Sequence, residues 1–264
     1  MNTINYLRLF SLSILIIVGL QCAGTKTEEV RNFDEYFKRG QQLFGKKRWD
    51  RAIEAFTMLL INSPGGELAD DAQYYMGECY FNKKEYLLAI SEYQQLVERY
   101  TYSPLVEDGY YKIALSYFLL SPKYSRDQEN TYKALIQLQD FIDTFPGSRH
   151  RPEIEQKIET LRAKLARKLF ESGRLYRKLE EWEPAIVYLD NMLEKYYDTE
   201  WAVQAKIEKA YCLIQLRRFD EYQALVGAID FSAATLTARR IWLEQAYARM
   251  QRQLKKEQAR QTKS

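Results

Sequence analysis

The sequence has few of the residues that build catalytic or metal centres. It has one histidine, His150, and three cysteines in 264 residues. A catalytic triad would have to use His150, and no nucleophile signature lies near it. A zinc site needs several cysteines or histidines at ligand spacing, and Cys79 and Cys212 are expected to be buried, reduced thiols. Without phosphate-binding glycine motifs either, the sequence predicts neither enzyme activity nor a cofactor.

Helix breakers are also scarce, with 6 prolines and 11 glycines. Good helix formers such as Ala, Leu, Glu, Lys and Gln are frequent, which favours an all-α protein. Aromatic residues are abundant in contrast, with 21 tyrosines and 12 phenylalanines. That is more than one compact core needs, so we expect an elongated structure whose helices pack against one another through aromatic residues.

The N-terminus predicts an export signal. Arg8 is the only charged residue before residue 25, and an apolar run of twelve residues, Leu9 to Leu20, follows it. Such a run is shorter than the roughly 20 residues that span a bilayer, but it fits the apolar region of a signal peptide. A buried helix or short anchor is the alternative. We assign residues 1–21 to the signal peptide and 22–32 to a linker.

Cys22 is the candidate for lipid attachment. Bacterial lipoprotein signals place a leucine and two small residues before the cysteine that carries the lipid. Here Leu20 lies one position late and Gln21 is a poor match. A lipid on Cys22 would anchor the protein to one leaflet without a transmembrane helix. The alternative is ordinary cleavage near Gly24, which would release a soluble periplasmic protein.

The interior of the sequence repeats at an interval of 37 residues. The segment FDEYFKRGQQLFGKKRWDRAIEAF (33–56) aligns with DDAQYYMGECYFNKKEYLLAISEY (70–93). The matched pairs are Gly40 and Gly77, Phe44 and Phe81, Ala52 and Ala89, and Phe56 and Tyr93. Self-similarity at this period indicates stacked supersecondary units.

Each unit is predicted to contain two amphipathic helices, whose small residues let the paired helices approach closely. Proline and glycine in the segments SPGG and TYSP end the units. The expected helices span 33–46, 49–62, 68–82, 85–99, a long helix at 153–179, a short helix at 219–229 and a last helix at 233–260.

These units resemble the tetratricopeptide repeat. The first supplies Tyr36, Gly40, Ala52, Phe56 and Pro64, and the second supplies Gly77, Tyr80, Ala89 and Tyr93. The resemblance implies a right-handed superhelix of about five helix pairs with a C-terminal capping helix. We place repeats 1–3 at 33–148, repeats 4–5 at 149–230 and the basic C-terminal helix and tail at 231–264.

In tetratricopeptide proteins the first helices line a concave groove. The family pattern implies that these positions of the first three units face it: Phe37, Gln41, Phe44, Tyr74, Glu78, Phe81, Tyr111, Leu115 and Phe118. Aromatic side chains bury large areas, so two such rows suit an extended or helical partner segment. The alternative is that the rings fill the interior of the superhelix or pack under the N-terminal segment 25–32.

The stretch SPKYSRDQENTYKAL (121–135) interrupts the repeat. Ala114 and Ala134 are twenty residues apart, against twelve for the equivalent pairs of the first two units. The insertion enlarges the turn between paired helices, and Ser125 or Asp127 is expected to cap the helix that follows.

The insertion carries a second resemblance. Its Arg126, Asp127 and Gln128 are similar to an element in the enlarged third repeat of the BamD family, the tetratricopeptide lipoproteins of the outer-membrane β-barrel assembly machinery. The segment ALIQLQDFIDTFPGS (134–148) and the turn at 196–199 are similar as well, although Tyr197 replaces a proline.

The BamD resemblance implies a non-enzymatic scaffold tethered by Cys22 to the periplasmic face of the outer membrane. Its C-terminal repeats would hold the periplasmic domains of BamA, and its N-terminal groove would receive unfolded outer-membrane β-barrel proteins. The alternative is a periplasmic tetratricopeptide adaptor of the cell-envelope or division machinery, like CpoB. Such adaptors usually carry an N-terminal coiled coil, and no sustained heptad pattern precedes residue 33.

The C-terminal segment 232–264 is basic, with eight Lys or Arg residues and two acids. A charge run of this kind is usually a solvated helix face, although acidic partners or lipid headgroups are possible ligands. Because an export signal precedes the repeats, nucleic acid is not an expected partner.

Overall fold

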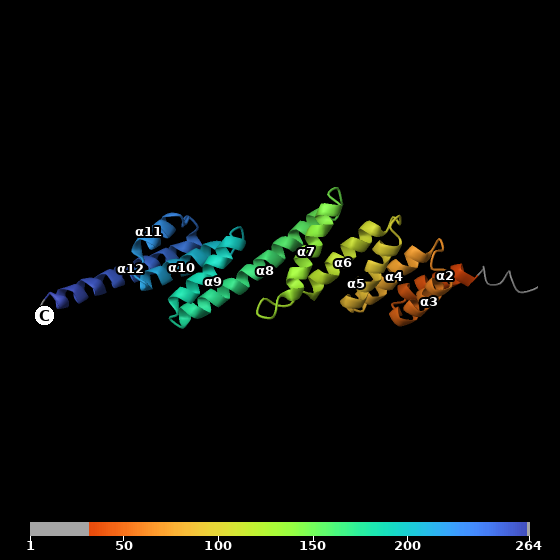
Figure 1. Ribbon diagram of the computed structural model, residues 1–264, viewed down its shortest axis with the longest axis horizontal. Coiled ribbons are helices and arrows are strands. Elements are labelled where there is room, and N and C mark those ends of the chain that lie inside the picture. The colour runs from red at the N-terminus through yellow and green to blue at the C-terminus, as the bar shows by residue number, and fades with distance from the viewer. Residues whose placement is uncertain (1–31, 263–264) are drawn as a thin grey trace, which may run out of the picture. The chain divides into compact units, whose positions relative to one another are not determined.

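The structure is a computed structural model that describes residues 32–262, in which all regular elements are helices (Figure 1). The helices, numbered from α2, are α2 (Asn32–Gly45), α3 (Trp49–Asn62), α4 (Ala69–Asn82), α5 (Tyr86–Arg99), α6 (Val106–Leu120), α7 (Glu129–Thr144), α8 (Arg151–Lys178), α9 (Trp182–Lys195), α10 (Ala202–Gln215), α11 (Phe219–Gly227) and α12 (Ala234–Gln261). The predicted all-α, tetratricopeptide-like organisation is confirmed. The predicted signal peptide, most of the linker and Cys22 lie outside the described residues.

The chain forms two compact units, one ending at Leu119 and the other beginning at Leu120. In the N-terminal unit α2 packs on α3, α3 on α4, and α4 on α5. The core between the first two pairs includes Phe56, Leu59 and Met76. Helix α6 joins this stack where its Gly109 lies against Val97 of α5.

The repeated glycines allow the paired helices to approach closely. A Cβ atom on Gly40 would overlap the ring of Phe56, and one on Gly77 would overlap the ring of Tyr93. Both rings are fully buried. The glycine and the aromatic residue that recur in the sequence are therefore two halves of one contact.

Four helix pairs share one turn geometry. Lys47, Lys84, Glu180 and Arg217 have φ between 57° and 64°. After Lys84, for example, Glu85 N–H donates to Tyr80 C=O and Lys84 N–H donates to Phe81 C=O. This is the Schellman pattern, which usually places glycine in the left-handed position. Between α6 and α7 the insertion replaces this turn.

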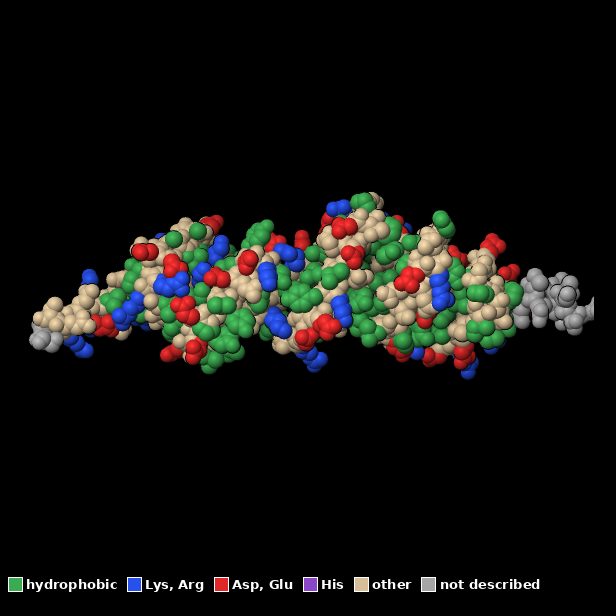
Figure 2. All heavy atoms as spheres, in the orientation of Figure 1, with side chains coloured by type: hydrophobic (Ala, Val, Ile, Leu, Met, Phe, Trp, Pro, Cys, Tyr) green, Lys and Arg blue, Asp and Glu red, His purple; other side chains and the backbone are tan. Residues whose placement is uncertain are grey.

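The C-terminal unit contains α7 to α12 in full. Helix α8 packs on α7, α9 and α10, while α10 packs on α9, α11 and α12. Its core includes Leu165, Leu189 and Leu213. Helix α12 contributes Leu243 and partly buried side chains up to Met250 to this core. Beyond Met250 none of its described residues belongs to the core, and Figure 2 shows Lys and Arg side chains there.

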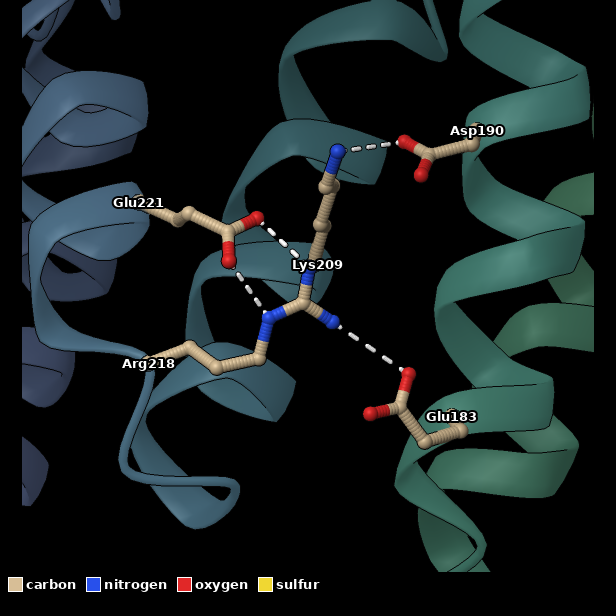
Figure 3. Close-up of polar contacts among 5 residues, drawn as sticks. All are labelled: Glu183, Asp190, Lys209, Arg218 and Glu221. Carbon is tan, nitrogen blue, oxygen red and sulfur yellow. Dashed lines mark hydrogen bonds and ion pairs between the residues drawn. The ribbon is translucent and has the colours of Figure 1, made fainter.

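A polar network joins α9, α10 and α11 on the surface of this unit (Figure 3). Arg218 donates twice to the Glu221 carboxylate and once to Glu183, while Lys209 Nζ lies 2.5 Å from Asp190 Oδ1. The Arg218 hydrogen bonds lower the pKa of Glu221. Because these groups are largely exposed, the network orients the helices more than it stabilises them.

Both described cysteines, Cys79 and Cys212, are buried and free, which confirms that prediction. Burial raises the pKa of each thiol to about 12. Neither is a reactive thiolate near neutral pH.

Candidate functional site

The predicted groove positions on α2 are largely part of the protein core. Phe37 is only 9% exposed, and its ring centroid lies 5.9 Å from those of both Phe56 and Tyr75. Phe44 packs 5.2 Å from Tyr75 in the same way. Gln41 is exposed, and its Nε2 lies 3.5 Å from the Tyr75 hydroxyl. Tyr75, which the repeat pattern did not single out, is the centre of this aromatic cluster.

The predicted positions on α4 and α6 are partly exposed. They are Tyr74, Glu78 and Phe81 on α4, and Tyr111, Leu115 and Phe118 on α6. The Tyr74 ring lies 5.8 Å from Tyr93, and Lys112 Nζ lies 4.7 Å from the centroid of Phe81. We call the set Tyr74, Phe81, Tyr111, Leu115 and Phe118 the aromatic surface.

Glu78 lies beside this surface and is neutralised by its neighbours. Its Oε1 lies 2.5 Å from Lys112 Nζ of α6 and accepts a 2.5 Å hydrogen bond from the Tyr93 hydroxyl. Burial and the nearby Glu78 carboxylate raise the pKa of Tyr74 and of Tyr93. Glu78 therefore links α4, α5 and α6 and adds no net charge to the aromatic surface.

The insertion is closed by Gln128, which is 3% exposed. Its side-chain amide donates to the carbonyl groups of Lys123 and Arg126 at 2.9 Å and of Asp127 at 3.3 Å. Its Oε1 accepts a hydrogen bond from Thr131. The expectation that Ser125 or Asp127 caps α7 is wrong, because the N-cap residue is Gln128 and it makes no side-chain capping bond; Asp127 lies one residue earlier, and its Oδ1 accepts the Glu129 N–H at 2.8 Å. Arg126 is exposed and takes part through its backbone: its N–H donates to the Lys123 carbonyl at 3.0 Å, and its carbonyl group accepts from Gln128 and Lys168.

Basic residues of α8 hold the insertion in place. Lys164 Nζ donates to Ser121 Oγ and Lys168 Nζ to the carbonyl of Arg126, both at 2.8 Å. The guanidinium of Arg167 lies 4.2 Å from the ring centroid of Tyr124 and 5.4 Å from that of Trp201. Sequence reasoning missed these three residues, although their spacing on one helix face is a visible signal.

A cavity of about 730 Å³ lies between the insertion, α8 and the turn before α10. We call it the insertion cavity. Its lining residues are Lys123, Tyr124, Ser125, Thr160, Ala163, Lys164, Arg167, Glu200 and Trp201.

A second polar contact that the sequence did not reveal joins α8 to α10. Arg177 Nε lies 2.5 Å from Glu208 Oε2, and Glu208 is only 3% exposed. Arg239 of α12 approaches the same carboxylate at 3.9 Å. A nearly buried carboxylate needs such partners, so this contact ties three helices together.

No helix within the described part of the chain is long and apolar enough to cross a membrane.

Comparison with known families finds one family model, YfiO, described as "Outer membrane lipoprotein", that matches residues 31–224. Among curated proteins, "Outer membrane protein assembly factor BamD" of Rickettsia prowazekii is 25% identical over 84% of this chain and 90% of its own length. The protein of the same name in Caulobacter vibrioides is 24% identical over 80% of this chain and 71% of its own length. The protein of the same name in Helicobacter pylori is 27% identical over 56% of this chain and 68% of its own length.

Solved structures with tetratricopeptide repeats are also similar. The TPR2AB domain of yeast Sti1 in its pHSP90 complex is 14% identical with a TM-score of 0.37, covering 83% of this chain and 98% of the other. TTC0263, a tetratricopeptide protein of Thermus thermophilus, is 20% identical with a TM-score of 0.34. The match covers 81% of this chain and 98% of TTC0263.

Proposed function

Because the chain belongs to the outer membrane lipoprotein family YfiO, whose model matches well over half of it, we propose that it is an outer membrane protein assembly factor that acts as a scaffold. Its BamD relatives carry that function in their names, and they confirm the resemblance expected from the sequence. The proposed scaffold uses no catalytic residues. Lipid on Cys22 would hold it at the periplasmic face of the outer membrane.

The observation that best supports substrate binding is the aromatic surface of the N-terminal unit. Tyr74, Phe81 and Phe118 are partly exposed on consecutive first helices, and the adjacent Glu78 and Lys112 neutralise each other. An uncharged, ring-rich surface suits the aromatic side chains of an unfolded β-barrel strand. Covering such a strand would also keep it from pairing with other strands and aggregating.

The C-terminal unit is the proposed attachment point for BamA. Helices α8 to α12 are joined by the ion pairs of Glu208 with Arg177 and Arg239 and by the Arg218 network, which makes a preorganised surface for a folded partner. The periplasmic domains of BamA are the proposed partner because the family resemblance implies them. The two units would then have separate roles, substrate capture and attachment to the machinery.

The substrate role predicts that removing aromatic rings weakens peptide binding. The probe is a fluorescent synthetic peptide with the aromatic-terminated last strand of an outer-membrane barrel protein. We expect Tyr74→Ala combined with Phe81→Ala to weaken its binding roughly tenfold or more, since anchor residues each contribute over about 1 kcal/mol. Fluorescence anisotropy measures the affinity, and circular dichroism checks the helix content.

Two further variants keep this test decisive. Tyr74→Leu with Phe81→Leu preserves most of the packing volume and should show the same loss. Tyr102→Ala removes a fully exposed ring elsewhere in the same unit and should change nothing. Equal affinity of the wild-type protein and the two double variants, with intact helicity, would contradict the substrate role.

A further inference from the structure

The insertion cavity contains three basic side chains that have no anionic partner. Within the described residues, none of Lys123, Lys164 and Arg167 lies within ion-pair distance of a carboxylate. The single acid in the lining, Glu200, does not pair with them either. The cavity therefore has an excess of positive charge that the protein leaves uncompensated.

Four of the nine cations of α8 form no ion pair within the described residues, namely Lys164, Arg167, Lys168 and Lys178. Five other cations of the helix do form ion pairs, namely Arg151, Lys157, Arg162, Arg174 and Arg177. Arg162 lies next to the cavity and is paired with Asp198 at 2.7 Å. Carboxylates are thus within reach of this helix, but not at the positions that line the insertion cavity.

Arg167 lies against two aromatic rings. Trp201 packs against the buried ring of Phe170 at 5.3 Å, and Arg167 stacks on Trp201 and Tyr124. Contact with aromatic rings uses none of the guanidinium N–H donors, which are the groups that bind a carboxylate in bidentate fashion.

Lys164 adds a second donor that is partly withdrawn from water. Among the described residues its ammonium group has one hydrogen-bond partner, Ser121 Oγ, and burial lowers its pKa. An anion beside Lys164 would offset the desolvation of the ammonium group.

We propose that the insertion cavity binds an acidic peptide segment. Arg167 and Lys164 receive a carboxylate of that segment, and the rings of Tyr124 and Trp201 contact an apolar side chain next to it. A peptide fits better than a membrane surface because the cations lie in a recess walled by aromatic rings, whereas lipid headgroups meet exposed basic surfaces such as the end of α12. This binding does not depend on the proposed assembly function.

The experiment starts from a phage library of random twelve-residue peptides, selected against the full-length protein in detergent. We expect enrichment of peptides with Asp or Glu beside an apolar or aromatic residue. The best peptide is then synthesised together with its Asn/Gln counterpart, and both are titrated calorimetrically. Arg167→Gln and Lys164→Gln should each weaken binding of the acidic peptide roughly tenfold, because each removes a charge-assisted hydrogen bond.

Lys178→Gln is the matched control, since it removes the same charge from α8 roughly 16 Å along the helix. It should leave binding unchanged. Arg167→Lys keeps the positive charge but loses the planar guanidinium with its paired N–H donors and its aromatic contacts. The affinity for the acidic peptide should therefore fall by an intermediate amount. Thermal unfolding of each variant confirms that the C-terminal unit remains folded.

Two results would overturn the proposal. One is a selection that does not enrich acidic peptides, or an acidic peptide whose affinity for Arg167→Gln equals its affinity for Lys178→Gln. The other is binding of phosphatidylglycerol vesicles that Arg167→Gln abolishes, with no acidic peptide enriched, which would assign the cavity to a phosphate headgroup.

Discussion

At the scale of single residues, the repeat depends on pairs in which glycine on one helix accepts an aromatic ring from the next. Tyr93 is fully buried, and its hydroxyl is fixed by Glu78, so its ring cannot move away from Gly77. The recurring Gly40–Phe56 pair obeys the same constraint. Tetratricopeptide-like units therefore tolerate change poorly at these positions.

Gly77→Ala tests this constraint. The added methyl group would overlap the Tyr93 ring, and overpacking of this kind costs about 1–3 kcal/mol. That loss should exceed the roughly 1 kcal/mol by which helices favour alanine over glycine. Urea denaturation should therefore show a lower free energy of unfolding.

Gly45→Ala is the control, because no atom lies within 4 Å of the added Cβ. It should leave stability unchanged or raise it slightly. Equal effects of the two substitutions would show that the ring contact does not limit packing.

Much at the residue scale was not predictable from the sequence. Phe37 shares the 37-residue spacing of Tyr74 and Tyr111, which are partly exposed, yet Phe37 is buried and packs against Tyr75 of the following helix pair. The Arg177–Glu208 and Glu78–Lys112 pairs likewise join different helices. Periodicity assigns a side chain to a helix face, but it does not identify the long-range partner that covers it.

At the scale of elements, the sequence predicted helix positions to within two residues for the helices it specified. The repeated amphipathic pattern and the Pro/Gly turns explain this agreement. The turns inside the helix pairs were harder to predict from the sequence, because lysine, glutamate and arginine occupy left-handed positions that usually hold glycine. The insertion was evident from the broken interval, but its attachment to α8 depends on tertiary contacts.

The left-handed turns predict that Lys84→Gly stabilises the N-terminal unit. A left-handed conformation costs a non-glycine residue roughly 1–2 kcal/mol, whereas glycine lowers stability by a smaller amount through the unfolded state. Lys84→Ala removes the same side chain and keeps the Cβ. Calorimetry should give a higher melting temperature for the glycine variant than for the alanine variant, and the reverse order would refute the turn assignment.

Gln128 is predicted to hold the insertion closed. Gln128→Ala removes three hydrogen bonds to backbone carbonyls. The free energy of opening residues 121–128 should therefore fall by about 2 kcal/mol. Hydrogen exchange of this segment should then accelerate roughly 30-fold.

Gln139→Ala is the control for the insertion, because Gln139 is exposed and its side-chain amide donates to Asp143 of its own helix. It should not change exchange in the insertion. Unaltered protection of residues 121–128 in Gln128→Ala would mean that the contacts with α8 suffice to close the loop.

At the scale of the whole molecule, the chain combines two helical units with different surfaces. The N-terminal unit carries the aromatic surface, while the C-terminal unit carries the insertion cavity and the basic end of α12. This division suits a scaffold that receives one partner on each unit. The chain belongs to the family whose model is described as "Outer membrane lipoprotein", and the proposed assembly role is the central claim.

The most direct test of that claim is affinity purification of the protein from detergent-solubilised native membranes, with mass spectrometry of its partners and of its N-terminal peptide. We predict that BamA is recovered and that the N-terminal residue is a diacylglyceryl-modified Cys22. Recovery of division or peptidoglycan proteins without BamA, or an unmodified N-terminus that starts beyond Cys22, would contradict this account.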